Sequence, residues 1–221
     1  MKVSEIFNSI EGEGKRAGAP CTFIRLFGCN LRCTYCDSMY AVEGHDYTEM
    51  TVDEIIEKVK EWDWCKKVTV TGGEPLIQED IKQLLCKLLE ENFIVNVETN
   101  GSRPLIELPE GRSGVTAYEL FYTIDFKTGT SGMMDKMCPK AFEHLKHGDV
   151  IKFVVGSEED LMQVKDFCES HYLLASIYVS PIFGKIEPKD IVEFIQKNRL
   201  WNWKVQLQLH KYIWSVDTRG V

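Results

Sequence analysis

Three cysteines stand close together in the stretch GCNLRCTYCDS, residues 28–38. Cys29, Cys33 and Cys36 are too many for one disulfide and too few for a structural zinc site, which usually takes four ligands from paired C-x2-C knuckles. The sequence has no second knuckle. Three thiolates fit a [4Fe-4S] cluster that leaves one iron without a protein ligand and therefore reactive. A zinc site completed by a histidine or a distant cysteine remains the alternative.

The other five cysteines are scattered along the chain, and we expect them to be small buried apolar side chains. They are Cys21, Cys65, Cys86, Cys138 and Cys168. A disulfide scaffold is typical of small secreted domains, not of a chain of this size.

The composition is that of an ordinary globular protein, with 221 residues, 44% hydrophobic and 27% charged. This length suits one domain spanning residues 1–221. The net charge of -8 and the lack of a basic run exclude a nucleic-acid partner. No apolar run reaches the ~20 residues that cross a membrane. The start MKVSEIFNSIEGEG is not a secretory signal, so we expect a cytoplasmic protein.

Strand-like and helix-like segments alternate along the chain. Apolar or β-branched runs predict strands at 21–27, 67–70, 93–97, 120–126, 150–155, 175–180 and 204–209. Amphipathic patterns and cap residues predict helices at 51–62, 78–92, 157–171 and 187–198. Thr51 and Glu54 form a capping box pattern, Ser157 is an expected N-cap, and Pro188 suits a helix start. Alternating strands and helices indicate a mostly parallel α/β sheet.

The polar residues of interest come directly after these predicted strands, and active sites in such sheets lie beyond the carboxyl ends of the strands. We therefore expect them to meet at one end of the sheet. They are Gly28-Cys29, Thr71-Gly72-Gly73-Glu74-Pro75, Glu98-Thr99-Asn100-Gly101, Lys127, Pro181 and His210-Lys211.

Each of these residues also has a structural interpretation. Gly72-Gly73 suits either a plain turn or a backbone that a ligand approaches closely. Glu98 suits an ion pair with a lysine, and His210 suits a structural histidine. Arg25 lies in an apolar run and needs an internal partner, either a protein acid or a substrate carboxylate.

Two long loops, 103–119 and 128–139, either cover a site or are surface excursions.

The C-x3-C-x-aromatic-C spacing, followed by GGEP at 72–75, resembles the radical S-adenosylmethionine (SAM) superfamily. The resemblance implies that the open iron binds the methionine part of SAM. It also implies that cleavage of SAM yields a 5′-deoxyadenosyl radical, which abstracts hydrogen from the substrate. Tyr35, the aromatic residue of the motif, is expected to pack beside the cluster and SAM.

The segments EIFNSIEGEG, CNLRCTYCDS, TGGEP, VETNG and LHK, together with Arg25, resemble the 7-carboxy-7-deazaguanine synthases from Glu5 to about Lys211. The resemblance implies a partial (β/α) TIM-like barrel and a homodimer served by a flavodoxin-type electron donor. The implied reaction is the conversion of 6-carboxy-5,6,7,8-tetrahydropterin to 7-carboxy-7-deazaguanine with loss of ammonia, in queuosine and deazapurine biosynthesis. The implied cofactors are a [4Fe-4S] cluster, SAM and Mg²⁺.

The same resemblance implies roles for individual residues, and it assigns no certain catalytic side chain because the radical comes from SAM. Cys29, Cys33 and Cys36 would hold the cluster, and Ser38 would bind Mg²⁺. The residues that would bind SAM are Gly73, Glu74, Glu98, Asp125 and Lys127. The residues that would bind the pterin are Ile10, Glu11, Gly12, Glu13, Arg25, Thr71 and His210, with Arg25 on its carboxylate.

Three features depart from the family pattern. Glu11 replaces the glutamine of a QGEG motif, and Asp125-Phe126-Lys127 replaces Ser-Pro-Lys. The chain also runs on through YIWSVDTRGV, residues 212–221, which argues against a role for Val221.

Two other functions share part of this sequence pattern. A glycyl-radical activase shares the cluster motif and GGEP but acts on a partner protein, whereas EGEG and Arg25 favour a small carboxylated substrate. A non-catalytic zinc protein leaves GGEP and the polar strand ends unexplained.

Overall fold

The computed structural model describes residues 1–108, 119–215 and 218–221. Their strands form one sheet in the order β3-β1-β2-β4-β5-β6-β7-β8-β9. The strands are β1 (Lys2–Ile10), β2 (Pro20–Leu26), β3 (Thr48–Glu49), β4 (Lys67–Gly72), β5 (Ile94–Thr99), β6 (Leu120–Phe126), β7 (Val150–Val155), β8 (Ser176–Pro181) and β9 (Trp203–Val205). The helices are α1 (Val52–Lys60), α2 (Ile81–Glu90), α3 (Glu158–Ser170), α4 (Pro188–Asn198) and α5 (His210–Ile213).

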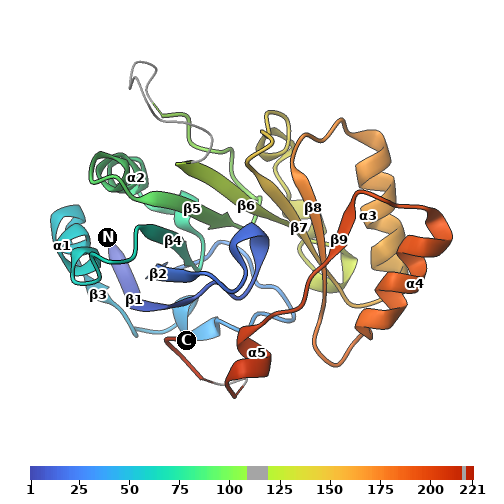
Figure 1. The fold of residues 1–221 in the computed structure, drawn as a ribbon, viewed down its shortest axis with the longest axis horizontal. Coiled ribbons are helices and arrows are strands. Elements are labelled where there is room, and N and C mark those ends of the chain that lie inside the picture. Colours follow the sequence, from blue (N-terminus) through green and yellow to red (C-terminus); the bar gives the residue numbers. More distant parts are fainter. Residues whose placement is uncertain (109–118, 216–217) are drawn as a thin grey trace.

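The sheet is an open, mostly parallel barrel, which confirms the predicted fold class. From β2 onward each strand is parallel to its neighbour, while β1 is antiparallel to both β2 and β3. The four longer helices lie on the outside of the curved sheet (Figure 1). The sequence patterns missed β1, β3 and α5, because these depend on antiparallel pairing or form a single turn.

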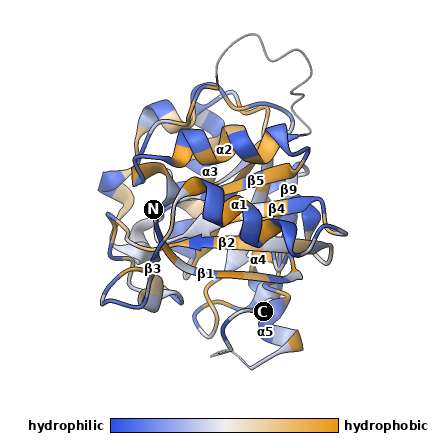
Figure 2. Cartoon of the chain, turned by 90° about the vertical axis from the view of Figure 1, so that its left-hand side faces the viewer, coloured by the Kyte–Doolittle hydropathy of each residue, from blue (hydrophilic) through white to orange (hydrophobic). Residues whose placement is uncertain are grey.

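The strands have one apolar and one polar face. The apolar face carries side chains such as Ile24, Val70, Val97, Ile124 and Phe153, which are buried in one core with the helices. Helices α1 and α2 show hydrophobic and hydrophilic colours on different sides in Figure 2. Burying each large apolar side chain contributes about 1.5–3 kcal/mol, so this outer core holds the sheet and the helices together. The inner face is therefore free to carry polar groups.

The predicted helix caps are present. Thr51 accepts a hydrogen bond from Glu54 N at 3.2 Å, and the Glu54 carboxylate accepts from Thr51 N at 2.7 Å. Ser157 Oγ accepts from Asp160 N at 3.3 Å, and Pro188 is the first residue of α4. The helix starts are thus set locally, as the capping patterns predict.

The loop between β1 and β2 joins the first part of the chain to the last. The Gln206 side chain, just after β9, accepts from Gly14 N at 2.8 Å and donates to Gly14 O at 3.0 Å. Leu209 N donates to Gly12 O at 3.0 Å. These bonds span the gap between β1 and β9, although the strands themselves do not pair.

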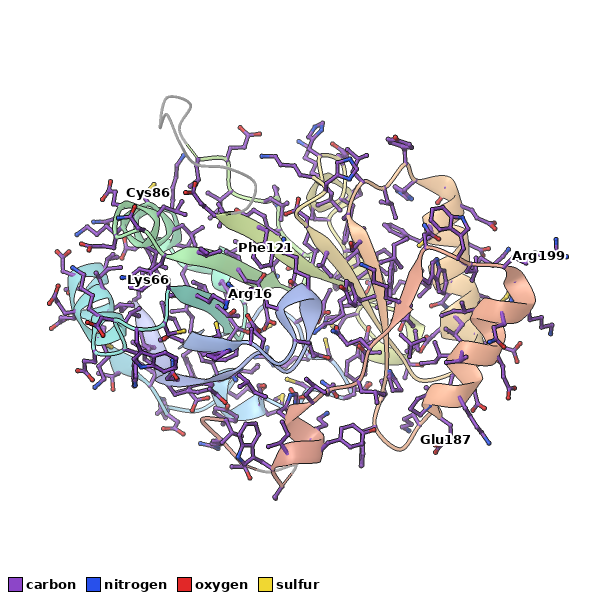
Figure 3. The ribbon with its side chains drawn as sticks, viewed as in Figure 1. Arg16, Lys66, Cys86, Phe121, Glu187 and Arg199 are labelled. Atoms are coloured by element: carbon purple, nitrogen blue, oxygen red, sulfur yellow. The ribbon has the colours of Figure 1, made fainter. Side chains whose placement is uncertain are left out.

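Arg16, in the same loop, covers the amino ends of β4 and β5. Its guanidinium donates to Val68 O at 3.1 Å and to Ile94 O at 3.0 Å, and it lies 5.2 Å from the Phe121 ring centroid (Figure 3). Arg16 therefore closes the barrel at the amino ends of these strands, and the cavity lies toward the carboxyl ends.

Candidate active site

The inner face of the barrel surrounds a cavity of about 620 Å³. Its volume lies within the range of small-molecule sites. The residues predicted for the site line it with one exception. They are Ile10, Glu11, Gly12, Glu13, Arg25, Cys29, Cys33, Cys36, Ser38, Thr71, Gly73, Glu98, Asp125, Lys127 and His210. The exception is Glu74.

The cysteine loop follows β2 and presents three free, half-buried thiols to the cavity. Within the described residues, no group of three or more His, Cys, Asp or Glu side chains converges on a single metal ion. Three thiolates at one point of the cavity wall are a donor set that iron–sulfur clusters use. Burial raises the pKa of the Cys33 and Cys36 thiols, so they need the positive charge that a cluster supplies.

The loop 128–139 holds the cysteine loop from outside the cavity. Thr34, between Cys33 and Cys36, donates from Oγ1 to Thr130 O at 2.7 Å and from its backbone N to Ser131 O at 3.1 Å. Of the other long loop, residues 109–118 lie outside the described part of the chain.

Tyr35, the aromatic residue of the motif, lines the cavity. Its ring lies 5.8 Å from Lys127 Nζ, and its buried hydroxyl has no hydrogen-bond partner among the described residues. An unpaired buried hydroxyl is costly, which makes it a contact point for a bound ligand.

Gly72 and Gly73 allow the end of β4 to pack directly on the start of the cysteine loop. Gly73 N donates to Leu26 O at 2.9 Å, and a Cβ on Gly73 would overlap Gly28 O. Gly72 has a φ of 138° and would clash with Leu26 in the same way. Both glycines also line the cavity, so the close approach involves protein backbone on one side and the cavity on the other.

Glu74 is the predicted SAM-binding residue that lies behind the cavity wall and does not line the cavity. Its fully buried carboxylate accepts from Leu76 N at 2.9 Å, Thr99 Oγ1 at 2.7 Å and Asn100 N at 2.7 Å. Asn100 in turn lines the cavity and donates to Cys29 Sγ at 3.5 Å. Glu74 therefore contacts the cavity wall through the Asn100 backbone.

A chain of alternating charges crosses the inner face between β6, β7 and the loop after β1. Lys127 Nζ lies 2.8 Å from Asp125 Oδ2, and Lys152 Nζ lies 2.8 Å from Glu13 Oε2. Burial alone would raise the pKa of Asp125, but the two lysines outweigh it and hold that pKa below its usual range. Asp125 is therefore an ionised acceptor at neutral pH.

Glu98 accepts a hydrogen bond from Thr71 Oγ1 at 2.8 Å. Burial raises the pKa of Glu98 to about 7, with Lys152 opposing and the carboxylates Glu11 and Glu13 adding to the rise. Among the described residues, Glu98 has a threonine as its hydrogen-bond partner and forms no ion pair with a lysine.

Arg25 has the protein acid that an interior guanidinium needs. Its Nε donates to Glu5 Oε1 at 2.7 Å, and the Tyr40 hydroxyl donates to the same oxygen at 2.7 Å. Glu5 engages Nε, and no described residue bonds the outer guanidinium nitrogens, so these are left for a ligand carboxylate in the cavity that Arg25 lines. The two proposed partners are thus compatible.

Glu11 is largely committed to the protein. It is 1% exposed, and its Oε1 pairs with Arg16 at 2.6 Å and accepts from Thr69. A glutamate rather than a glutamine at position 11 therefore provides the carboxylate that the buried Arg16 needs.

Gly12 and His210 lie against each other, because a Cβ on Gly12 would overlap His210 Nδ1. Burial lowers the pKa of His210, so its ring is mostly neutral at pH 7. Ser38 lines the cavity and donates to Asp37 Oδ1 at 3.0 Å, which places two oxygen groups side by side as a hard cation prefers.

Sequence reasoning missed several residues that line the cavity. Lys152 interrupts an apolar strand in the same way as Arg25, a signal that could have revealed it. The tail gave no such signal, yet Thr218, Arg219, Gly220 and Val221 line the cavity. Val221, for which the sequence argued against a role, thus lies in the cavity wall.

A loop with three cysteines in a partial barrel indicates a protein of the radical SAM class. The family model of the radical SAM superfamily matches residues 23–115. The fold is similar to QueE from Escherichia coli, with a TM-score of 0.74 and 21% identity over 94% of this chain and 93% of that one. It is less similar to Streptococcus suis SuiB, with a TM-score of 0.56 and 17% identity over 83% and 48%.

The family within this class is shown by relatives that match along the whole chain. The 7-carboxy-7-deazaguanine synthase of Clostridium acetobutylicum is 42% identical over 100% of this chain and 99% of its own. That of Chlorobaculum tepidum is 40% identical over 100% and 97%. The chain belongs to the 7-carboxy-7-deazaguanine synthase family of radical SAM lyases, whose cofactors are a [4Fe-4S] cluster and SAM.

Proposed function

We propose that this chain converts 6-carboxy-5,6,7,8-tetrahydropterin to 7-carboxy-7-deazaguanine and ammonia. The observation that carries the proposal is a single cavity with the cysteine loop and Arg25 both in its wall. A carboxylated substrate held by Arg25 would thus share one enclosed space with the cluster. When bound, the cluster and SAM supply the radical that abstracts hydrogen from the substrate.

The chain's own residues bind, orient and shield. Arg25 would grip the substrate carboxylate, with Glu5 fixing the guanidinium plane. Glu13 and Thr71, with Gly12 and His210 beside them, would hold the ring, whose N–H groups need acceptors. Asp125 and Lys127, together with Gly73 and Asn100, would surround SAM on the side of the cysteine loop.

Ser38 would bind Mg²⁺ together with oxygens of the substrate, and the adjacent Asp37 carboxylate would favour the cation electrostatically. The fit rests on the oxygen donors present at this point of the cavity wall.

Other parts of the proposal rest on the family resemblance. The homodimer, the flavodoxin-type electron donor and the cytoplasmic location stay predictions. Among the described residues, no helix is long and apolar enough to span a bilayer. Membership of the synthase family replaces the activase and zinc-protein alternatives.

The test is anaerobic reconstitution with iron and sulfide, followed by reduction and turnover with the carboxytetrahydropterin, SAM and Mg²⁺. We expect a four-iron cluster and 7-carboxy-7-deazaguanine as the product. Cys33→Ala should lose the cluster and the product, whereas Cys168→Ala, on helix α3, should keep both. The proposal fails if the intact cluster cleaves SAM but no deazaguanine forms.

A further inference from the structure

Lys152 is a buried lysine for which neither the family resemblance nor the proposed function gives a role. It lies in the middle of β7, between Ile151 and Phe153, which are fully buried in the outer core. Strand alternation therefore turns Lys152 to the inner face, where it is 8% exposed and lines the cavity. A buried ammonium costs several kcal/mol unless it is paired, so its partners are informative.

The two partners of Lys152 come from opposite sides of the site. Its Nζ lies 2.8 Å from Glu13 Oε2, in the loop that follows β1, and 3.3 Å from Asp125 Oδ1, on β6. Glu13 belongs to the proposed pterin side, and Asp125 to the proposed SAM side. Lys152 is thus the cation that bridges the two sides within the described part of the barrel.

Each partner has a buried oxygen with unused acceptor capacity. Glu13 Oε1 has no hydrogen-bond partner among the described residues, and Asp125 Oδ1 is met there by the Lys152 ammonium, at 3.3 Å. Buried acceptors are normally satisfied, and both carboxylates line the cavity, so a ligand is the expected source of the further donors. The N–H groups of a pterin and the hydroxyls of a ribose are donors of the required kind.

The local charge explains why a cation is needed at this point. Glu98 on β5 also acts electrostatically on Lys152, so three carboxylates surround the ammonium, while Lys127 compensates mainly Asp125. Without Lys152, Glu13 and Glu98 would repel each other with no cation to offset the repulsion. Glu13 would also lose the contact that holds its carboxylate in place.

We propose that Lys152 is a positioning residue that holds Glu13 toward the pterin and Asp125 toward SAM, so that one ammonium sets both binding sites. The inference rests on the proposed function, because that function assigns the two sides. Lys152 does not need to touch either ligand: it acts through the two carboxylates.

The experiment measures two affinities of the anaerobic holoenzyme separately, for SAM and for the stable probe 6-carboxypterin. We expect Lys152→Met to weaken both by about tenfold or more, since it leaves two buried carboxylates without their cation. Lys152→Arg should restore most of both affinities. The matched control is Lys204→Met, an exposed lysine on strand β9 that should leave both unchanged.

Double variants separate positioning from a merely structural effect. In a Glu13→Gln background, Lys152→Met should change 6-carboxypterin affinity by less than about twofold, because its route to the pterin is already removed. In an Asp125→Asn background, Lys152→Met should likewise change the affinity for SAM by less than about twofold. If Lys152→Met does not fold, Lys152→Gln, which retains an N–H donor, replaces it in the same cycles.

Two results overturn the inference. One is a Lys152→Met holoenzyme that binds both probes as the parent does. The other is a loss that is equally large with and without Glu13 or Asp125, which would make Lys152 structural. Failure of the parent holoenzyme to bind 6-carboxypterin would instead count against the proposed function.

Discussion

Single residues in this barrel show how the interior tolerates charge. Arg16, Arg25, Lys127 and Lys152 each have a carboxylate partner within 2.8 Å. The pairs offset part of the cost of burial, and Arg25, Lys127 and Lys152 also line the cavity. The site is therefore a set of preformed ion pairs that a ligand completes.

Arg25→Ala should weaken binding of 6-carboxypterin by about tenfold to a hundredfold, because a charge-assisted contact to a carboxylate is lost. Cleavage of SAM by the reduced cluster should survive. Binding is measured by titration of the probe and cleavage by release of deoxyadenosine. Equal loss of both would show that Arg25 is structural.

The carboxyl group of Glu98 should titrate near pH 7, since burial raises its pKa to about 7. Infrared difference spectra should show a protonated carboxyl band that disappears as the pH rises through this region and is absent in Glu98→Gln. Lys152 lowers this pKa, so Lys152→Met should move the midpoint to higher pH. A midpoint near 4.5 in the parent would contradict the burial argument.

At the scale of elements, the site depends on two segments, the loop 128–139 and the C-terminal tail. The loop contacts the cysteine loop, and the tail forms part of the cavity wall. The loop 128–139 holds Thr34 from one side, and the tail reaches the opposite wall. Arg219 pairs with Asp46 at 2.8 Å and lies 3.8 Å from the Tyr40 ring centroid. Tyr40 in turn bonds Glu5, the partner of Arg25.

Arg219→Ala should weaken 6-carboxypterin binding by about two- to fivefold, because an exposed ion pair and a cation–π contact each contribute only ~1 kcal/mol. Asp46→Asn should also weaken 6-carboxypterin binding, but by a smaller factor. Arg103→Ala removes an exposed arginine that does not line the cavity and serves as the control. An unchanged affinity would mean that the tail has no part in the site.

For the whole molecule, the join between the loop after β1 and the end of β9 replaces strand pairing across the open side of the barrel. Gln206 satisfies both backbone groups of Gly14, and Glu13 directly precedes that glycine. The Gln206 side chain thus links the integrity of the barrel to the position of Glu13, a proposed substrate-binding residue.

Gln206→Ala should lower the apparent melting temperature of the anaerobic holoenzyme by about 5 °C or more, because two buried backbone groups lose their partner. The affinity for 6-carboxypterin should fall as well. Gln196→Ala, an exposed position on α4, is the matched control. A normal melting temperature would show that water or neighbouring groups replace the amide.

Much of the fold could be predicted because its signals are local. The helix caps at Thr51 and Ser157 each depend on residues only a few positions apart in the sequence. The same holds for each apolar strand. The roles of Glu74 and Glu11 could not be predicted, since each depends on partners far along the chain. Glu74 bonds Thr99 and Asn100, and Glu11 bonds Thr69 as well as the nearby Arg16.

The amino-acid sequence by itself determined the class of chemistry, because three cysteines and Gly72-Gly73 are spaced within short segments. It also determined the alternation of strands and helices. Only the tertiary structure decided which polar residues share the cavity. Lys152 meets Glu13 across 139 positions of chain, and the tail reaches the wall beside Tyr40. Such contacts depend on how the sheet curves, which no local pattern encodes.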